Sequence, residues 1–172
     1  MFISKKTIRI LATITFGWLL LSDPGLAASS TNSEKVKLPK TPLPGLVGSS
    51  AFSGDTAKKP LTVIQFWASW CTGCGTVMGQ MTDLIGKNPK IGYLTISLDE
   101  SKDVAMKFFS NKEEKTKSAL PVSYLDASGA GFAEPNGVES LPYLIVVDRS
   151  GAVVRRIKGH PTKSDLDFLV KK

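Results

Sequence analysis

Apolar and β-branched residues gather in several short runs that are typical of strands. The run Leu61–Trp67 is mostly apolar, which indicates a strand that is buried on both faces. Further strand-like runs cover residues 91–98, 121–125 and 144–147. Residues 148–151 carry the signal of a tight turn, so we expect residues 153–157 to pair back antiparallel as the second strand of a hairpin.

Between and after these runs, apolar residues recur at helical spacing. One stripe runs from Val77 to Ile85 and stops at Gly86, a second follows the capping residue Ser101, and a short third one covers residues 166–170. Strands that alternate with helices and end in a hairpin plus a helix predict an α/β fold. We expect a three-layer α/β/α sandwich with a mixed central sheet and a C-terminal β-hairpin plus helix.

The segment before the first strand is built differently. Residues 1–28 contain three basic residues, then an apolar run of 12 residues and a small-residue end, which is the layout of a secretory signal peptide. The apolar run is shorter than the ~20 residues of a membrane-spanning helix, so we expect cleavage after Ala27 or Ala28, with an uncleaved anchor as the alternative. Both alternatives place the protein in the periplasm or another extracytoplasmic space.

Residues 29–60 are rich in Ser, Thr, Lys, Pro and Gly, and their four prolines exclude a long helix. We predict a flexible leader over residues 29–37, followed by a loose lead-in to the first strand. The folded domain is expected to cover residues 38–172.

Composition and charge narrow the class of protein. A chain of 172 residues with 42% hydrophobic and 22% charged residues fits one folded domain rather than a disordered segment. Its net charge of +7 comes from lysines spread among acidic residues, so we expect no nucleic-acid partner. Two cysteines are too few for a disulfide-dense scaffold or a closed zinc site. We expect the protein to be a monomer.

The two cysteines, Cys71 and Cys74, lie between the end of a predicted strand and the start of the following helix. Cysteines at this spacing are either half of a metal site or a redox pair. An inert structural disulfide is disfavoured, because so short a loop gains little closure entropy. The positive end of the helix dipole stabilises a thiolate, so we predict that Cys71 attacks first. Cys74, one helical turn on, then resolves the mixed disulfide.

The stretch Phe66–Cys74 resembles the active-site segment of the thioredoxin superfamily, and most of all that of the exported TlpA/ResA-like thiol-disulfide oxidoreductases. A second block, Gly137–Gly151, resembles the cis-proline strand, hairpin and glycine of the same family. The two blocks occur in the family's order and at its distance, and the resemblance extends over about residues 38–172. It implies a thioredoxin-like fold and an enzyme with Cys71 and Cys74 as its catalytic residues.

The resemblance also implies a substrate-binding surface. Pro142 would be a cis-proline that faces the cysteines, and Leu141 would offer its backbone groups to an extended segment of substrate. Trp70, next to the nucleophile, would shield the site and contact substrate. The expected partners are protein disulfides and a membrane or soluble thiol that donates electrons. We expect no cofactor and no bound metal.

Several residues depart from the family pattern. Gly73 stands where many relatives have proline, and Gln65 stands where a buried Asp or Asn is frequent. Val77 and Gly79 replace a frequent glutamate and a helix-kink proline, and Tyr143 follows Pro142 where cytochrome-maturation members often carry glutamate or threonine. The acid that assists proton transfer from the buried cysteine is therefore missing from its usual place. This leaves the direction of electron flow open.

The leading functional hypothesis is reduction of specific extracytoplasmic protein disulfides, for example in cytochrome c or copper-enzyme maturation. One alternative is a disulfide oxidant or isomerase. Another is a copper(I) carrier, because two thiolates suit Cu(I) and Met78 lies on the same helical face as both cysteines. A thiol-independent adaptor is a further option, although the cysteine pair argues against it. His160, the single histidine, lies in a loop and is expected to be a surface residue.

Overall fold

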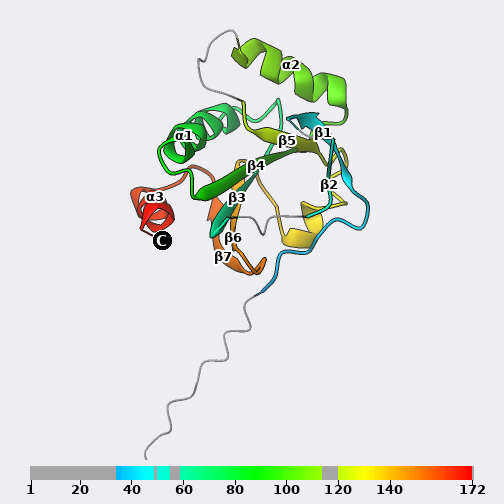
Figure 1. Cartoon of the computed structure of the whole chain (residues 1–172). Helices are drawn as coiled ribbons and strands as arrows, with labels where there is room; N and C mark the ends of the chain where they lie inside the picture. Colours follow the sequence, from blue (N-terminus) through cyan, green and yellow to red (C-terminus); the bar gives the residue numbers. More distant parts are fainter. Residues whose placement is uncertain (1–33, 49, 55–58, 114–119, 172) are drawn as a thin grey trace, which may run out of the picture. The chain divides into compact units, whose positions relative to one another are not determined.

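A computed structural model describes residues 34–48, 50–54, 59–113 and 120–171 (Figure 1). These residues belong to one compact unit that extends from residue 32 to residue 172. The predicted signal peptide and residues 29–33 of the predicted leader lie outside the described residues. None of the helices in the described ranges has both the length and the apolar character needed to cross a membrane.

A seven-stranded mixed sheet forms the centre of the domain, with the strand order β2-β1-β5-β4-β3-β6-β7. The strands are β1 (Leu43–Val47), β2 (Ala51–Phe52), β3 (Leu61–Trp67), β4 (Ile91–Ser97), β5 (Val122–Leu125), β6 (Tyr143–Asp148) and β7 (Val153–Lys158). The strand β3 pairs parallel with β4 and antiparallel with β6, and all its residues are buried. The β6–β7 hairpin is present as predicted, and the predicted α/β fold with a mixed central sheet is confirmed.

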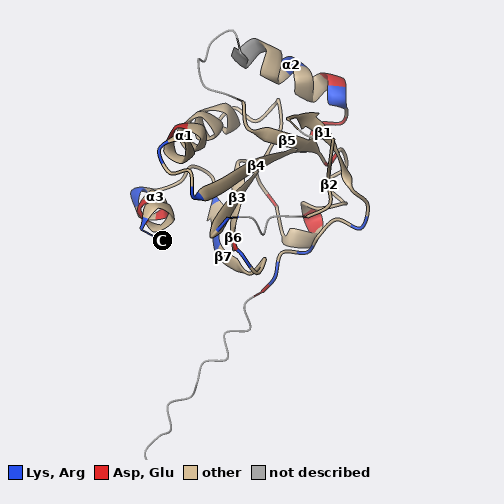
Figure 2. Ribbon diagram, in the orientation of Figure 1, with Lys and Arg blue, Asp and Glu red and all other residues tan. Residues whose placement is uncertain are grey.

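Three helices cover one face of this sheet: α1 (Cys74–Gly86), α2 (Lys102–Glu113) and α3 (Lys163–Val170). The connections β3–α1–β4 and β4–α2–β5 cross the sheet in the same direction, and right-handed crossovers in one direction put both helices on one face. Met81 of α1 and Leu169 of α3 pack in one apolar cluster with β3 and β6. Both α2 and α3 carry lysine as well as acidic residues (Figure 2).

The opposite face is covered by the connection between β5 and β6 rather than by a long helix. This connection contains the short 3₁₀ helix η1 (Glu134–Asn136), and its Phe132 packs on Phe66 of β3 with ring centroids 5.5 Å apart. The buried carboxylate of Asp126 accepts hydrogen bonds from the backbone N–H groups of residues 131, 132 and 133, which holds the connection against the sheet. The three predicted layers are therefore present, but the layer on this face of the sheet is an irregular connection with one short 3₁₀ helix.

The structure differs from the sequence prediction before β3. The segment predicted as a loose lead-in contains β1 and β2, and β1 pairs antiparallel with β5. Residues 34–37 also belong to the fold, although the predicted leader includes them. Lys35 forms a β-bridge with Ala152, and the N–H group of Val36 donates to the carbonyl of Gly151 (2.9 Å). The pairings with β5 and with residues 151 and 152 join segments that are distant along the chain, so the local proline and serine content does not reveal them.

Candidate active site

The cysteine pair lies where β3 ends and α1 begins, as predicted. Cys71 and Cys74 form a disulfide, and Cys74 is the first residue of α1. Cys71 is 8% exposed, whereas Cys74 is fully buried. Gly73 is the N-cap of α1 without a side-chain cap, and the first turn of α1 carries no acidic residue. The positive end of the helix dipole is therefore directed at the pair, and no carboxylate in the first turn of α1 neutralises it.

The turn that carries Cys71 is held by the buried carboxylate of Asp99, a contact that is not among the sequence predictions. Asp99, just after β4, accepts hydrogen bonds from the backbone N–H group (2.9 Å) and the hydroxyl (2.7 Å) of Ser69. It also accepts one from the hydroxyl of Ser97 (2.8 Å). Parallel strands β3 and β4 end at the same edge, so polar residues at the ends of both runs are the signal that points to this contact.

Two uncharged polar side chains, those of Gln65 and Tyr93, support the backbone of Cys74. The side-chain amide of Gln65, fully buried in β3, donates to the backbone carbonyl of Cys74 (3.1 Å). The hydroxyl of Tyr93 donates in turn to the side-chain oxygen of Gln65 (2.6 Å). Burial raises the pKa of Tyr93 well above its usual value, which keeps the phenol protonated. This strand position, where the family resemblance leads us to expect a buried Asp or Asn, thus holds the neutral amide of Gln65, with a neutral phenol as its partner.

An apolar cluster surrounds both cysteines. It includes Trp67, Met78 and Phe109, and Leu141 packs against it. Met78, considered above as a third ligand for Cu(I), is almost completely buried in this cluster and is a core residue. Among the residues that the structure describes, no group of three or more His, Cys, Asp and Glu side chains is placed to hold a metal ion.

The predicted substrate-binding residues lie around this cluster and at the surface. The peptide bond between Leu141 and Pro142 is cis, as expected from the resemblance. Pro142 is buried, and its carbonyl accepts a hydrogen bond from the N–H group of Gly159 (2.8 Å). Trp70 is 71% exposed, the largest exposure among the large hydrophobic residues that the structure describes. Tyr143, by contrast, is a core residue.

His160 is exposed, as expected, but the loop brings its side chain to the CxxC segment. A β-carbon built on Gly73 would lie 2.7 Å from Nε2 of His160. Sequence patterns do not predict this contact, because His160 follows β7 and is far from the cysteines along the chain.

Comparison with known proteins identifies the class that this fold and this site define. A family described as thioredoxin-like matches residues 60–153, more than half of the chain, and the chain belongs to this family. The thiol-disulfide oxidoreductase ResA of Bacillus anthracis is 32% identical over 110 residues, which cover 63% of this chain and 61% of ResA. The chain thus spans about three fifths of the length of such ResA relatives.

A second curated relative is the thiol:disulfide interchange protein DsbE homolog of Paracoccus denitrificans, 27% identical over 153 residues, which cover 87% of this chain and 79% of the relative. Among solved structures, StoA from Bacillus subtilis aligns with a TM-score of 0.59 and 17% identity over 74% of this chain and 94% of StoA. A DsbF homologue from Corynebacterium diphtheriae aligns with a TM-score of 0.59 and 19% identity over 81% of this chain and 88% of its own. At these identities the two structures support the fold alone.

Proposed function

We propose that the protein is a thiol-disulfide oxidoreductase that exchanges electrons with protein disulfides through Cys71 and Cys74. The observation that carries this proposal is the unequal exposure of the pair: Cys71 keeps 8% of its surface exposed, and Cys74 is fully buried at the start of α1. On this basis the sulfur of Cys71 reacts with the partner protein, and the buried sulfur of Cys74 reacts with Cys71. The names of the curated relatives support the same activity.

In the reducing direction, the thiolate of Cys71 attacks one sulfur of a substrate disulfide. A mixed disulfide forms, and the other substrate sulfur leaves as a thiolate. Cys74, once it has lost its proton, attacks the sulfur of Cys71, which restores the Cys71–Cys74 disulfide and releases the second substrate thiolate. Two electrons have then moved from the pair to the substrate, and the same steps in reverse oxidise a substrate dithiol. The uncapped N-terminus of α1 stabilises the Cys71 thiolate in both directions.

We assign substrate binding to Trp70, Leu141 and Pro142. The exposed ring of Trp70 follows directly after the turn that Asp99 holds, so it is presented beside Cys71 by a fixed backbone. Leu141 is partly buried against the cysteine cluster, and its cis bond to Pro142 precedes β6. An extended segment of substrate would lie between these two elements with its disulfide over Cys71.

We further propose that the protein acts outside the cytoplasm, on specific protein disulfides such as those of cytochrome c or copper-enzyme maturation. The pattern of residues 1–28 supports export, and a reduced pair in such a compartment needs a membrane or soluble thiol as its electron donor. The reduction potential distinguishes the reducing role from that of an oxidant or isomerase. A value near thioredoxin's ~−270 mV supports a reductase, and one near ~−120 mV supports an oxidant.

Two serine substitutions test the catalytic assignment. Cys71→Ser should abolish reduction of a protein disulfide such as those of insulin, because no accessible nucleophile is left. Cys74→Ser should accumulate a mixed disulfide between Cys71 and the substrate, because nothing resolves it. Non-reducing electrophoresis and mass spectrometry identify the trapped species. A mixed disulfide trapped through Cys74 in the Cys71→Ser variant would overturn the order of the two thiols.

A further inference from the structure

The imidazole of His160 occupies the space that a side chain between the two cysteines would fill. A β-carbon on Gly73 would lie 2.7 Å from Nε2, 3.4 Å from Cε1 and 3.6 Å from Cδ2 of His160. The first of these distances is too short for two unbonded heavy atoms of this kind, so a side chain at position 73 and the observed imidazole position exclude each other. Glycine at this position is therefore a condition for the contact.

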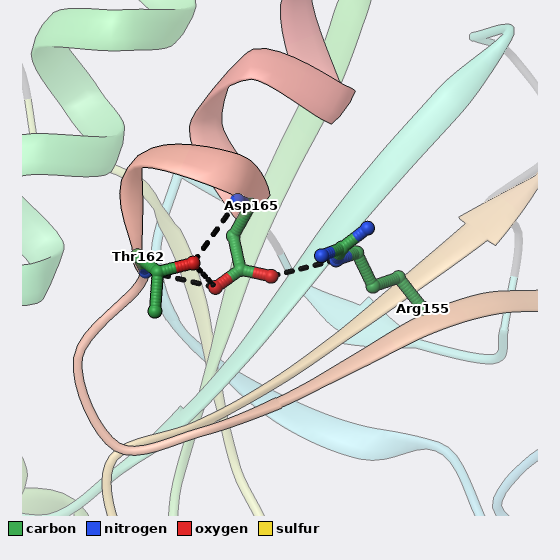
Figure 3. A network of polar contacts seen from close by, with 3 residues as sticks. All are labelled: Arg155, Thr162 and Asp165. Carbon is green, nitrogen blue, oxygen red and sulfur yellow. Dashed lines mark hydrogen bonds and ion pairs between the residues drawn. The ribbon is translucent and has the colours of Figure 1, made fainter.

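The loop that carries His160 is fixed at both ends, although the side chain itself is exposed. Before it, Gly159 adopts a left-handed conformation (φ 78°), and its N–H group donates to the carbonyl of Pro142. After it, Thr162 and Asp165 form a capping box at the start of α3, and Arg155 of β7 binds the same carboxylate (Figure 3). The backbone of His160 is thus anchored to the cis-proline segment on one side and to a capped helix on the other.

The charged residues close to His160 along the chain pair with other partners. Lys158 lies 3.4 Å from Glu139, Lys163 lies 3.0 Å from Asp167, and Asp165 lies 2.6 Å from Arg155. The first turn of α1 contributes no acidic residue, and Asp99 takes hydrogen bonds from residues 69 and 97. The three heavy atoms nearest to a β-carbon built on Gly73 all belong to the imidazole of His160.

We propose that His160 tunes the redox pair: its imidazole, seated against Gly73 between Cys71 and Cys74, stabilises the dithiol form with its thiolate and makes the couple more oxidising. This inference rests on the proposed function and assigns to it a residue that acts through the active-site loop. The physical basis is that a cationic or hydrogen-bond-donating group beside a thiolate favours the charged sulfur. Stabilising the reduced form in this way raises the reduction potential.

His160→Ala and His160→Gln test the inference when the purified protein is equilibrated with glutathione redox buffers. His160→Ala should shift the equilibrium toward the disulfide by about tenfold, which corresponds to a potential about 30 mV more negative. His160→Gln keeps a hydrogen-bond donor but no positive charge, so it should shift the equilibrium in the same direction by a smaller factor, about three- to tenfold. The thiolate absorbance of Cys71 near 240 nm should also appear at a higher pH than in the wild type. The exposed Lys163→Ala variant removes a positive charge from the first residue of α3, three positions after His160, and serves as the matched control, with an unchanged equilibrium.

A double-mutant cycle with Gly73→Ala separates this role from a general effect on the loop. The backbone at Gly73 (φ −87°, ψ −17°) accepts alanine, so the new methyl group should displace the His160 ring and lower the potential as His160→Ala does. In the His160→Ala background, Gly73→Ala should cause no further shift.

The outcomes distinguish the two proposals. Histidine variants that stay within about twofold of the wild-type equilibrium, or that shift it toward the dithiol, would overturn the role of His160, as would an equal effect of Gly73→Ala with and without the histidine. A wild-type protein that exchanges no electrons with glutathione would instead contradict the proposed function itself. Thermal unfolding of each variant confirms that it is folded before its potential is measured.

Discussion

At the scale of single residues, Gln65 shows how the site departs from the family pattern without losing its structure. Its amide donates to the carbonyl of Cys74 and accepts from the hydroxyl of Tyr93, so both of its polar ends are satisfied in a fully buried position. A buried polar group is tolerated only when it is bonded in this way. The pair supports α1 at its first residue and places no charge beneath the cysteines.

Tyr93→Phe should lower the free energy of unfolding by about 1–3 kcal/mol, because it leaves the buried oxygen of Gln65 without its donor. Urea unfolding measures this change. The double variant Gln65→Met/Tyr93→Phe should recover part of the loss, since removing both partners is cheaper than removing one. Unchanged stability of Tyr93→Phe would show that this hydrogen bond contributes nothing to the free energy of unfolding.

Above about pH 10 the wild type should lose stability, because the unfolded phenol ionises before the folded one, whose pKa is raised.

At the scale of elements, the start of α3 joins a helix cap to the neighbouring strand (Figure 3). The carboxylate of Asp165 accepts from the N–H group of Thr162 (2.8 Å) and from Nε of Arg155 (2.6 Å), while the hydroxyl of Thr162 accepts from the N–H group of Asp165 (3.3 Å). Burial alone would raise the pKa of Asp165, but the hydrogen bonds from Thr162 and the charge of Arg155 outweigh it and lower the pKa. The cap thus ties α3 to β7 as well as closing the helix.

Asp165→Asn should lower the free energy of unfolding at pH 7 by about 1–2 kcal/mol, through loss of the cap and of the ion pair with Arg155. Because the folded pKa lies below the unfolded value, the carboxylate stabilises the fold above about pH 4, and this contribution disappears as the pH falls through the folded pKa. Denaturant midpoints of wild type and variant should therefore converge in acid. A difference that stays constant down to the lowest pH would exclude the carboxylate as its cause.

At the scale of the whole molecule, the N-terminal end of the described chain docks on the C-terminal hairpin of the sheet. Residues 34–37 dock beside the β6–β7 hairpin, where Lys35 bridges to Ala152 and Glu34 forms an ion pair with Arg156. The side chain of Val36 is buried in the apolar cluster on the face opposite α1. The folded domain therefore includes a segment that lies before the predicted boundary at residue 38.

Val36→Ala should lower the free energy of unfolding by about 2 kcal/mol, since two buried carbon groups are lost at ~0.8 kcal/mol each. Val170→Ala makes the same chemical change at a residue that is 44% exposed, compared with 7% for Val36, and should cost much less. Urea unfolding of both variants in the full chain gives the comparison. Equal effects at the two positions would mean that residues 34–37 do not stabilise the domain.

Features of this protein that depend on short-range patterns are predictable from its residues alone. The strand Leu61–Trp67, the helix after Cys74 and the β6–β7 hairpin follow from local periodicity and turn residues, and the CxxC pair follows from its place between strand and helix. The cis bond at Pro142 was predicted from the family resemblance, not from local physics.

The tertiary structure alone decided the contacts between segments that are distant along the chain. The carboxylate of Asp99 on Ser69, the ring of His160 against Gly73 and the pairing of Lys35 with Ala152 each join elements whose approach depends on strand order and crossover direction. The two prolines in and before β1 obscured that strand, because its pairing with β5 is a property of the assembled sheet. Local propensity cannot encode such contacts, because their free energy is gained only when the packed sheet brings both partners together.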